Sequence, residues 1–454
     1  MDYAEELWAK RQRVQDALTR LGGSDVTVEE ILGAAQPLRY RNKSQYPVSA
    51  DGRVGFYRAR SHQVVEVEHC LLQKPQADAL AAALRQYLAQ YHVPGYDETT
   101  GRGLVRHLYV RSNCKGESLV CLLVNGESLP YETELVALLR QAAPQTVGVV
   151  LGVNTRPGNA ILGDRYRTLW GEDALTDVLC GRTVRLSVPS FYQVNHPQAE
   201  VLYGKALEFA GLTGTELAVD LYCGAGTITQ VLARQARHVI GGEIVPEAIR
   251  DARASARRNG VENVEFLGGD AADVAAELAL RQLRPDVICV DPPRKGLAPE
   301  VIASIAAMAP RRVVYVSCDP GTLGRDVKRF AEMGYLARRA VAVDLFPRTR
   351  HVETVVLLSK GEVDSKKIRV EFSLEDMDMS EFQDGATYTQ IKDYVLEHNG
   401  LKVSNLYISQ IKRKCGIEVG KNYNLPKSED SRQPLCPPEK EKAIREAFKY
   451  FGMT

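Results

Sequence analysis

The stretch ELAVDLYCGAGTIT, residues 216–229, sets the architecture of the largest part of the chain. It is an apolar strand pattern that runs directly into a glycine-rich turn and the start of a helix. Glycines in such a turn let the backbone approach a ligand at the helix N-terminus. The spacing is Gly-x-Gly followed by Thr227, without the third glycine of the dinucleotide fingerprint, so this motif alone fits a nucleotide-like ligand and a plain tight turn equally well.

Five further apolar strand patterns follow, each separated from the next by a helix-length segment. They read HVIGGEI (238–244), VEFLG (264–268), DVICVD (286–291), RVVYVS (312–317) and ETVVLLS (353–359). Strands that alternate with helices indicate an α/β fold with a parallel, doubly wound sheet. Ligands of such sheets bind beyond the carboxyl ends of the strands, so the residues directly after each strand are the first candidates for a site.

The rest of the chain has a different texture on either side of this region. Residues 1–190 mix helical periodicity with short strand patterns, which predicts an N-terminal α+β domain. Residues 191–360 hold the alternating strands and helices. An acidic stretch, EFSLEDMDMSEFQD (371–384), then leads into helical patterns, so residues 361–454 are predicted to form a small, mainly helical domain.

The composition is that of a globular protein, with 454 residues of which 25% are charged and 44% hydrophobic. No stretch approaches the roughly 20 apolar residues of a membrane span, and the N-terminus is too polar for a signal peptide, which favours a cytoplasmic location. The 9 Cys are scattered without CxxC pairs, so we expect reduced thiols and no metal site.

Two segments near the N-terminus alternate basic or polar residues with aromatic ones: RYRNKSQY (39–46) and RVGFYRAR (53–60). The net charge of the chain is only +1, so a nucleic-acid partner would need a local basic patch. These segments either supply part of such a patch for RNA or form a solvated sheet face.

Acidic residues follow the second, third and fourth strands. Glu243 lies about 20 residues beyond the glycine turn, where an acid could bind two ribose hydroxyls, and Asp270 could accept a hydrogen bond from an adenine amino group. Either carboxylate could instead be a helix N-cap or a solvated group. Asp291 precedes two prolines, which fix φ and remove two backbone donors, so the loop is either a rigid platform that exposes this carboxylate or a structural turn. Enzymes that methylate base amino groups usually carry an aromatic residue where this chain has Arg294.

The fifth strand ends in VSCDPGTLGRD. Asp319 is predicted to be a helix N-cap with proline as the first helical residue, so the thiol of Cys318 lies beside a helix N-terminus. That dipole, helped by Arg294 or Arg325 if either is near, is expected to lower the thiol pKa below about 8.5, although Asp319 acts in the opposite direction. Because Cys318 lies beyond the strand, we interpret it as a nucleophile rather than a core residue.

The last strand begins with His-Val-Glu-Thr. His351 and Glu353 are two residues apart and can share a face, at the same sheet edge as Cys318. Glu353 is either desolvated or at the solvent boundary, and burial would raise its pKa toward a value useful for proton transfer. Upstream of the first strand, Gln193 offers an amide group and Asn195 is a predicted N-cap.

In this order, the motifs FYQVNHPQAE, DLYCGAGTIT, VDPPRKGL, VSCDPGTLGRD and FPRTRHVETV resemble the S-adenosylmethionine-dependent RNA uracil-C5 methyltransferase family. Within it, the bacterial 23S ribosomal RNA members are the most similar, and the resemblance covers nearly all of residues 1–360. It implies a class I methyltransferase, Rossmann-like sheet, S-adenosylmethionine as cofactor and RNA as partner. It makes Cys318 the nucleophile and Glu353 the base that removes a proton. The cofactor contacts that it implies are Gln193, Tyr222, Thr227, Glu243, Asp270 and Asp291.

The chemistry of this family explains the residue types. Carbon 5 of uracil is a poor nucleophile, but addition of a thiolate at carbon 6 creates an enolate that lets carbon 5 accept a methyl group. A base then removes the proton of carbon 5, and the sulfur is eliminated. The target base must leave its stack, a cost that aromatic and basic contacts around it would repay.

Two departures from the family pattern bear on the substrate. Ribosomal members usually carry an RNA-binding barrel, and often three cysteines of an iron–sulfur cluster, before the place that Met1 matches. Cys70 matches the place of the fourth cluster ligand but has no partner cysteines at the expected spacing, so no cluster is expected. Transfer RNA methyltransferases of the family also lack the barrel, so a short chain fits both substrates.

The leading hypothesis is therefore a monomeric RNA (uracil-5)-methyltransferase that acts on 23S ribosomal RNA. A transfer RNA methyltransferase is the alternative of the same class, and a non-catalytic RNA-binding or ribosome assembly factor is the alternative of a different class. In the C-terminal region, YISQIKRKCGIE (407–418) is either a basic helix face for RNA or a ribosomal protein, or an ordinary solvated helix.

Overall fold

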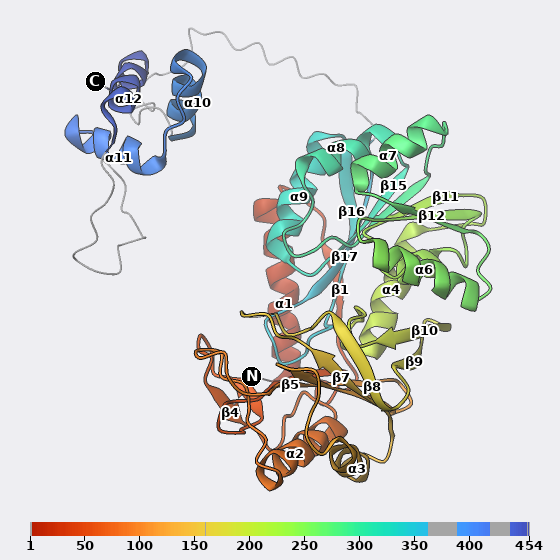
Figure 1. Ribbon diagram of the computed structural model, residues 1–454. Coiled ribbons are helices and arrows are strands. Elements are labelled where there is room, and N and C mark those ends of the chain that lie inside the picture. Colours follow the sequence, from red (N-terminus) through yellow and green to blue (C-terminus); the bar gives the residue numbers. More distant parts are fainter. Residues whose placement is uncertain (1, 159, 362–387, 418–435, 452, 454) are drawn as a thin grey trace. The chain divides into compact units, whose positions relative to one another are not determined.

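The computed structural model divides into two compact units, residues 1–364 and residues 365–454 (Figure 1). The residues that it describes are 2–158, 160–361, 388–417, 436–451 and 453. The acidic stretch at 371–384 lies outside them. The division into three domains that the sequence predicts stays a prediction.

An eight-stranded sheet forms the centre of the first unit. Its strands lie in the order β1-β16-β17-β15-β14-β11-β12-β13, and all neighbours are parallel except those of β17. Their bounds are β1 (Val28–Leu32), β11 (Leu217–Leu221), β12 (His238–Glu243), β13 (Val264–Gly268), β14 (Val287–Val290), β15 (Arg312–Ser317), β16 (Tyr335–Val343) and β17 (Glu353–Lys360). The parallel, doubly wound sheet predicted from the sequence is confirmed.

The antiparallel strand β17 is the exception to the predicted alternation of strands and helices. A short connection joins β16 to β17, and only antiparallel neighbours can be joined without a long crossover. The ladder of β15 and β17 pairs Ser317 with Thr354. Glu353 therefore begins β17 at the edge of the sheet where β15 ends and Cys318 follows.

Helices cover both faces of this sheet (Figure 1). Ala218 and Val219 are neighbours in β11 but belong to two different cores, as the alternation of side chains along a strand requires. One face carries α4 (His196–Ala210), α5 (Thr227–Leu232) and α6 (Pro246–Arg258). The other carries α7 (Ala271–Leu280), α8 (Pro299–Met308), α9 (Pro320–Glu332), α1 (Tyr3–Asp16) and the π-helical turn η1 (Ala17–Leu21).

The beginning of the chain belongs to the eight-stranded sheet as well. β1 lies parallel to β16, with Val28 beside Ala340. Helix α1 is fixed to the connection before β17 by Lys10, whose Nζ donates hydrogen bonds to Asp344 at 2.7 Å and to Glu6 at 2.8 Å. The residues before 33 thus complete the sheet that the sequence assigns to residues 191–360.

A five-stranded sheet lies between β1 and β11 in the chain, in the order β2-β5-β6-β7-β8. Its strands are β2 (Lys43–Pro47), β5 (Val105–Ser112), β6 (Ser118–Val124), β7 (Thr146–Val153) and β8 (Arg165–Gly171). Helices α2 (Pro75–Gln90) and α3 (Glu132–Ala142) pack on this sheet, and two ribbons complete the region: β3 (Gly55–Tyr57) with β4 (Val64–Glu66), and β9 (Ala174–Leu179) with β10 (Arg182–Ser187). Side chains of β5, β6, β9 and α4 share one core, so the two sheets of the unit are packed together.

The second unit has a core of its own, formed by Ile391, Ile408, Ile444 and Phe448. Its helices are α10 (Tyr388–Asn399), α11 (Asn405–Lys414) and α12 (Pro438–Tyr450). The helical character predicted for this region is confirmed for the residues that are described. Among the helices of the described residues, none combines the length and apolar character that spanning a bilayer requires.

Candidate active site

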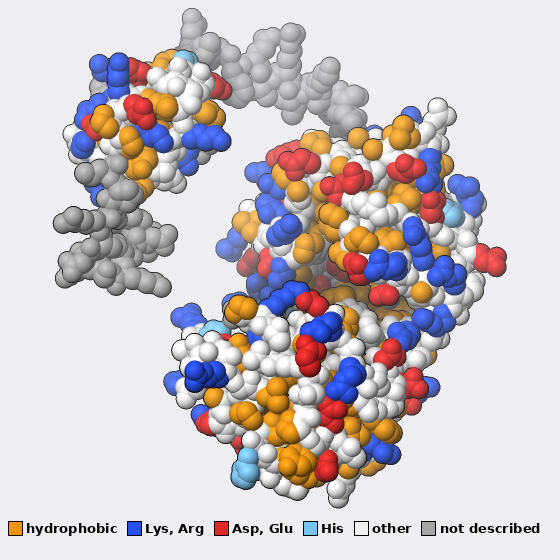
Figure 2. Space-filling view, viewed as in Figure 1, with side chains coloured by type: hydrophobic (Ala, Val, Ile, Leu, Met, Phe, Trp, Pro, Cys, Tyr) orange, Lys and Arg blue, Asp and Glu red, His pale blue; other side chains and the backbone are white. Residues whose placement is uncertain are grey.

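The candidate residues gather at the edge of the eight-stranded sheet where its parallel strands end. Tyr222, Glu243, Asp291 and Cys318 each stand at or directly after the end of β11, β12, β14 or β15. Figure 2 shows that the first unit is hollowed between its two halves, with hydrophobic side chains inside the hollow and Lys and Arg side chains at its margin. Because four separate strands contribute a residue, the sheet itself brings them together.

The predicted nucleophile, Cys318, is half-buried at the start of α9. Asp319 is the N-cap of this helix, as predicted, and its Oδ1 accepts hydrogen bonds from the backbone N–H groups of Gly321 and Thr322 at 2.9 and 3.0 Å. This cap fixes the turn on which the thiol is carried.

The prediction of a lowered pKa for Cys318 is wrong. Burial raises the pKa of this thiol to about 11, and the negative charges of Glu353 and Asp291 raise it further, while Arg294 lowers it. Arg325 is instead engaged by Asp326, to which its Nε donates at 2.8 Å. Burial first, and the two facing carboxylates after it, therefore outweigh the cationic surroundings that the local sequence suggests.

The predicted base, Glu353, is only 4% exposed. Burial raises its pKa to about 8, the charge of Asp291 adds to the effect, and Arg294 opposes it. Of the two alternatives that the sequence leaves open for this side chain, the desolvated one holds. A carboxyl group with a pKa near the working pH can take up a proton and release it again.

Asp291 and Gln193 lie in the same neighbourhood. Burial raises the pKa of Asp291 to about 7. Both act on the buried Tyr203 of α4. Burial and the charge of Asp291 raise the pKa of its hydroxyl, and a hydrogen bond with the Gln193 side chain lowers it. Glu353 also raises the pKa of Tyr203. Gln193, Asp291 and Glu353 therefore surround one buried hydroxyl group.

A second group of residues surrounds the glycine-rich turn after β11. Glu243 accepts hydrogen bonds from the backbone N–H of Gly224 at 3.1 Å and of Val245 at 2.9 Å. Burial, followed by the charges of Asp270, Asp326 and Glu243, raises the pKa of Tyr222. The structure thus brings Tyr222, Glu243 and Asp270 together, and Thr227 begins α5 at the end of the same turn.

Asp270 is the N-cap of α7. Its Oδ1 accepts hydrogen bonds from the backbone N–H groups of Ala272 and Asp273 at 2.8 and 3.0 Å. The N-cap alternative that the sequence leaves open for this residue is thereby confirmed, and a contact with a ligand stays a prediction. Asn195 occupies the predicted N-cap position of α4, but its side chain donates to the carbonyl oxygen of Leu345 at 3.1 Å.

His351 does not join Cys318 through any hydrogen bond. Its ring packs edge-on against Phe346 at a centroid distance of 6.0 Å. Burial and the charges of Arg294 and Arg350 lower its pKa, so the imidazole is neutral at physiological pH. Arg294 is therefore near His351, Glu353 and Cys318 at once.

Sequence reasoning missed Asp220, which lies in the middle of β11 and is fully buried. Its Oδ2 accepts a hydrogen bond from Thr229 at 2.6 Å, while its Oδ1 has no hydrogen-bond partner in the described residues. Burial raises its pKa to about 7, and the charges of Asp291 and Glu243 contribute. An acid inside the apolar run LAVDL was the signal that could have found it. The pKa of Asp220 thus responds to one residue from each group, Asp291 and Glu243.

The parallel sheet, the glycine-rich turn and the acidic residues at the strand ends define a Rossmann-like α/β fold with a ligand site at the strand ends, and the similar proteins identify it as that of a class I methyltransferase. The model of the tRNA (uracil-5-)-methyltransferase family matches residues 181–361. An uncharacterised RNA methyltransferase of Clostridium tetani is 42% identical over 363 residues, which cover 79% of each chain. A relative from Halalkalibacterium halodurans with the same description is 43% identical over 363 residues, again 79% of each chain.

A solved structure gives the same result. The tRNA (uracil-54, C5)-methyltransferase of Pyrococcus abyssi, in complex with S-adenosyl-L-homocysteine, superposes with a TM-score of 0.67 at 25% identity and covers 79% of this chain and 84% of its own. The chain therefore belongs to the S-adenosylmethionine-dependent RNA (uracil-5)-methyltransferase family and is an RNA-modifying enzyme.

Proposed function

We propose that the chain methylates carbon 5 of a uridine in 23S ribosomal RNA through a covalent bond between Cys318 and carbon 6 of the uracil. The observation that carries the proposal is the juxtaposition of Cys318 and Glu353 at the facing ends of β15 and β17, where the charge of one raises the pKa of the other. A thiol and a carboxyl group are the two reactive groups that this reaction needs.

The residues around the glycine turn fit S-adenosylmethionine. A Cβ built on Gly224 would meet no heavy atom within 4 Å, so the backbone is open to a ligand there. Asp220 has a buried oxygen without a hydrogen-bond partner in the described residues, and the pKa values of Asp220 and Asp291 are both raised. Two buried acids without a positive partner would be stabilised by a cationic ligand such as the sulfonium of S-adenosylmethionine. We propose that Glu243, Tyr222, Asp270, Thr227, Gln193 and Asp291 hold this cofactor, which supplies the methyl group when bound.

Cys318 and Glu353 act in turn on the uracil. The thiol of Cys318 passes its proton to solvent water and its sulfur forms a bond to carbon 6, and the electron pair of the carbon 5–carbon 6 double bond moves to carbon 5 and the enolate oxygen. After carbon 5 has accepted the methyl group, the carboxylate of Glu353 takes the proton from carbon 5. The electron pair then expels the sulfur of Cys318, which restores the aromatic ring and the thiolate.

The raised pKa of Cys318 means that the thiol is protonated in the ligand-free protein. Only a small fraction is ionised at neutral pH, so proton loss has to accompany attack on carbon 6 or precede it. Arg294 is the group that favours ionisation of both Cys318 and Glu353. We propose that Arg294 stabilises the negative charge that these two groups carry during the reaction.

Basic side chains in β2 and just before it support an RNA substrate. Lys43 lies directly opposite Arg111 in the ladder, and burial together with the charges of Arg111 and Arg41 lowers its pKa. Like charges at opposite positions destabilise a sheet unless an anion lies between them. Asn42 connects this strand to the site, since its Nδ2 donates to the carbonyl oxygen of Gln193 at 2.9 Å. We propose that Arg41 and Lys43 contact RNA phosphates, whereas Arg111 is buried and donates to the carbonyl oxygen of Ser190 at 2.6 Å.

The aromatic residues of the same segment have another role. Tyr40 is buried and donates a hydrogen bond to the carbonyl oxygen of Pro347 at 3.0 Å, and Tyr46 is buried and donates to Asp78 at 3.1 Å. Arg39 also pairs with Asp78, at 2.6 Å. Of the segment 39–46, the basic residues Arg41 and Lys43 therefore remain for RNA.

RNA that contains 5-fluorouracil tests the covalent step. Fluorine cannot leave as a proton, so the methylated base should stay attached to Cys318, and tryptic mass spectrometry should find the adduct on the peptide that contains this residue. Cys318→Ala should give no adduct, whereas Cys70→Ala should give the same amount as the unaltered protein. An adduct on another cysteine, or none, would overturn the mechanism.

The choice of 23S ribosomal RNA rests on the motif resemblance, and transfer RNA is the alternative because the Pyrococcus abyssi protein acts on tRNA. Both RNAs are incubated with the enzyme, digested and analysed for 5-methyluridine. Methylation of 23S RNA alone is the expected result, and methylation of tRNA alone would favour the alternative. We also propose that the enzyme is a monomer, which light scattering during size-exclusion chromatography would measure.

A further inference from the structure

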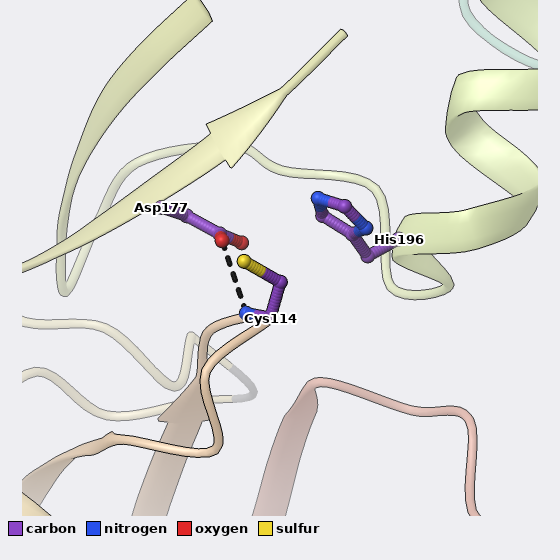
Figure 3. Close-up of side chains that lie close together, drawn as sticks. All are labelled: Cys114, Asp177 and His196. Atoms are coloured by element: carbon purple, nitrogen blue, oxygen red, sulfur yellow. Dashed lines mark hydrogen bonds between the residues drawn. The ribbon is translucent and has the colours of Figure 1, made fainter. Parts of the chain in front are cut away.

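Three potential metal ligands come together away from the active-site residues. Cys114, Asp177 and His196 each offer a ligand atom, and these atoms lie within 4.8 Å of one another. Figure 3 shows the side chains converging from the loop after β5, from β9 and from the first residue of α4. They are 63 and 19 residues apart in the chain, so no sequence motif joins them.

The carboxylate of Asp177 is held in a fixed position. It is 1% exposed, its Oδ1 accepts a hydrogen bond from the backbone N–H of Cys114 at 3.0 Å, and its Oδ2 accepts one from the hydroxyl of Tyr192 at 2.8 Å. Donors that orient a carboxylate in this way are a regular feature around metal ligands. The site is therefore organised before any ion binds.

The other two ligands are held as well. The turn that carries Cys114 is joined to β9 by Asn113, whose Nδ2 donates to the carbonyl oxygen of Thr176 at 2.8 Å. The Nε2 of His196 donates to the carbonyl oxygen of Val178 at 2.6 Å, which fixes the orientation of the imidazole.

The thiol of Cys114 is exposed and donates its proton to Asp177, and this hydrogen bond is the main reason why its pKa is raised. A divalent cation would take the place of that proton. In a tetrahedral zinc site with bond lengths of about 2.0–2.3 Å, neighbouring ligand atoms are roughly 3.5 Å apart. Because Cys114 is at the surface, rotation of its side chain can supply most of the small contraction that this requires.

We propose that Cys114, Asp177 and His196 bind a zinc ion, with water as the fourth ligand. Thiolate, imidazole and carboxylate together are a set that Zn²⁺ prefers, whereas Mg²⁺ and Ca²⁺ prefer oxygen ligands alone. On binding, the thiol proton of Cys114 passes to solvent and a Zn–S bond forms, with no change of oxidation state. The ion would connect the loop after β5, β9 and α4, next to the segment that carries Gln193.

Zinc titration of the full chain tests this proposal. The protein is stripped with a chelator and titrated with Zn²⁺ in competition with a chromophoric chelator. We expect one ion per chain with a Kd below about 1 μM. Cys114→Ser and His196→Asn should lose this ion, whereas the matched controls Cys70→Ser and His92→Asn should keep it. Asp177 is left unchanged because its carboxylate also holds Cys114 and Tyr192.

Two further measurements distinguish zinc bound by all three ligands from zinc bound by a single exposed cysteine. Co²⁺ in place of Zn²⁺ should give a sulfur-to-metal charge-transfer band that is absent in Cys114→Ser, and excess Mg²⁺ should not displace it. Tyr192→Phe removes one hydrogen bond to Asp177 and should weaken zinc binding about 10- to 100-fold. Equal zinc binding by the unaltered chain and Cys114→Ser, or no tight zinc binding at all, would overturn the proposal.

Discussion

Glu353 begins the strand that lies antiparallel to the strand ending just before Cys318, and its charge raises the pKa of that cysteine. Ser317 and Thr354 form the last pair of the ladder. Cys318 and Glu353 occupy the next position along it, one on each chain segment. A nucleophile and a base are thus held by one sheet rather than by loops. This relationship underlies the first three predictions.

Glu353→Gln should separate bond formation from proton removal. Without the carboxylate, uracil should still be attacked and methylated but should not be released, so turnover should fall at least about 100-fold. Ordinary RNA should then remain attached to Cys318 in a complex that survives denaturing electrophoresis. Glu332→Gln, at the exposed end of α9, is the matched control. Full turnover by Glu353→Gln would show that another group removes the proton.

The stability of the ligand-free protein should depend on Glu353. Its pKa is raised from 4.5 to about 8, so the folded state keeps a proton that the unfolded chain releases, and stability falls as the pH rises between these values. Glu353→Gln removes this penalty. At pH 8.5 the variant should therefore have a higher Tm than the unaltered protein, and its free energy of unfolding should be larger by a few kcal/mol at most. Near pH 4.5 the two proteins should have equal Tm values. A Tm difference that does not change with pH would contradict this origin.

Arg294 should control how easily Cys318 ionises. Its charge lowers the pKa of the thiol, so Arg294→Gln should shift the pH dependence of iodoacetamide alkylation at Cys318 upward and slow the reaction at pH 9 by up to about tenfold. Arg294→Lys should restore part of the rate. Lys295→Gln, a neighbouring exposed cation, should leave it unchanged. Mass spectrometry of each cysteine peptide gives the rates, and equal rates for all variants would refute the role of Arg294.

Two glycines of the turn after β11 should respond differently to alanine. A Cβ at Gly224 meets open space, so we expect Gly224→Ala to weaken S-adenosylmethionine binding at least about tenfold by occupying the space of the ligand. Its φ of +54° is unfavourable for alanine and should lower the free energy of unfolding by about 1–2 kcal/mol. A Cβ at Gly226 would lie 2.8 Å from the ring of Phe266, so Gly226→Ala should mainly lower Tm. Calorimetric titration and thermal unfolding measure both. Unchanged cofactor affinity in Gly224→Ala would place the cofactor elsewhere.

Lys43 should contribute to RNA affinity through charge. Lys43→Gln should weaken binding and reduce the slope of log K against log salt concentration by about 1, because one phosphate contact is lost. Arg167→Gln is the control, since Arg167 is already paired with Glu132 at 2.6 Å. Fluorescence anisotropy over a range of salt concentrations measures the slopes. An identical slope for Lys43→Gln and the unaltered protein would remove Lys43 from the interface.

The sequence predicts the candidate site residues better than it predicts the edge strand β1 of the eight-stranded sheet. Cys318 and Asp291 could be found because residues after parallel strands converge whatever the loops do. Glu353 instead begins the antiparallel β17, and the sequence motif pointed to it. β1 could not be placed, because its neighbour β16 is remote in sequence and VEEIL carries no sign of which strand it joins. Strand pairing across such distances depends on the assembled sheet.

Electrostatics were the other part that local sequence could not supply. The helix N-terminus beside Cys318 is visible in the sequence, but the burial of the thiol and the charges of Glu353 and Asp291 enter only through the fold. Together, burial first, they reverse the expected direction of the pKa shift. Cys114 looked like one of several scattered thiols for the same reason. Its neighbours Asp177 and His196 come from a ribbon strand and a helix that only folding brings to it.

The insertion of the five-stranded sheet between β1 and β11 has a consequence during synthesis. β1 and α1 leave the ribosome long before the strand and the acid that they contact, since β16 and Asp344 are made only near the end of the first unit. Until then, the early segment has an unpaired strand edge, which favours capture by other chains or by chaperones. If translation stops before residue 335, β1 never acquires its partner strand β16. We expect such fragments to be degraded by proteases rather than to accumulate.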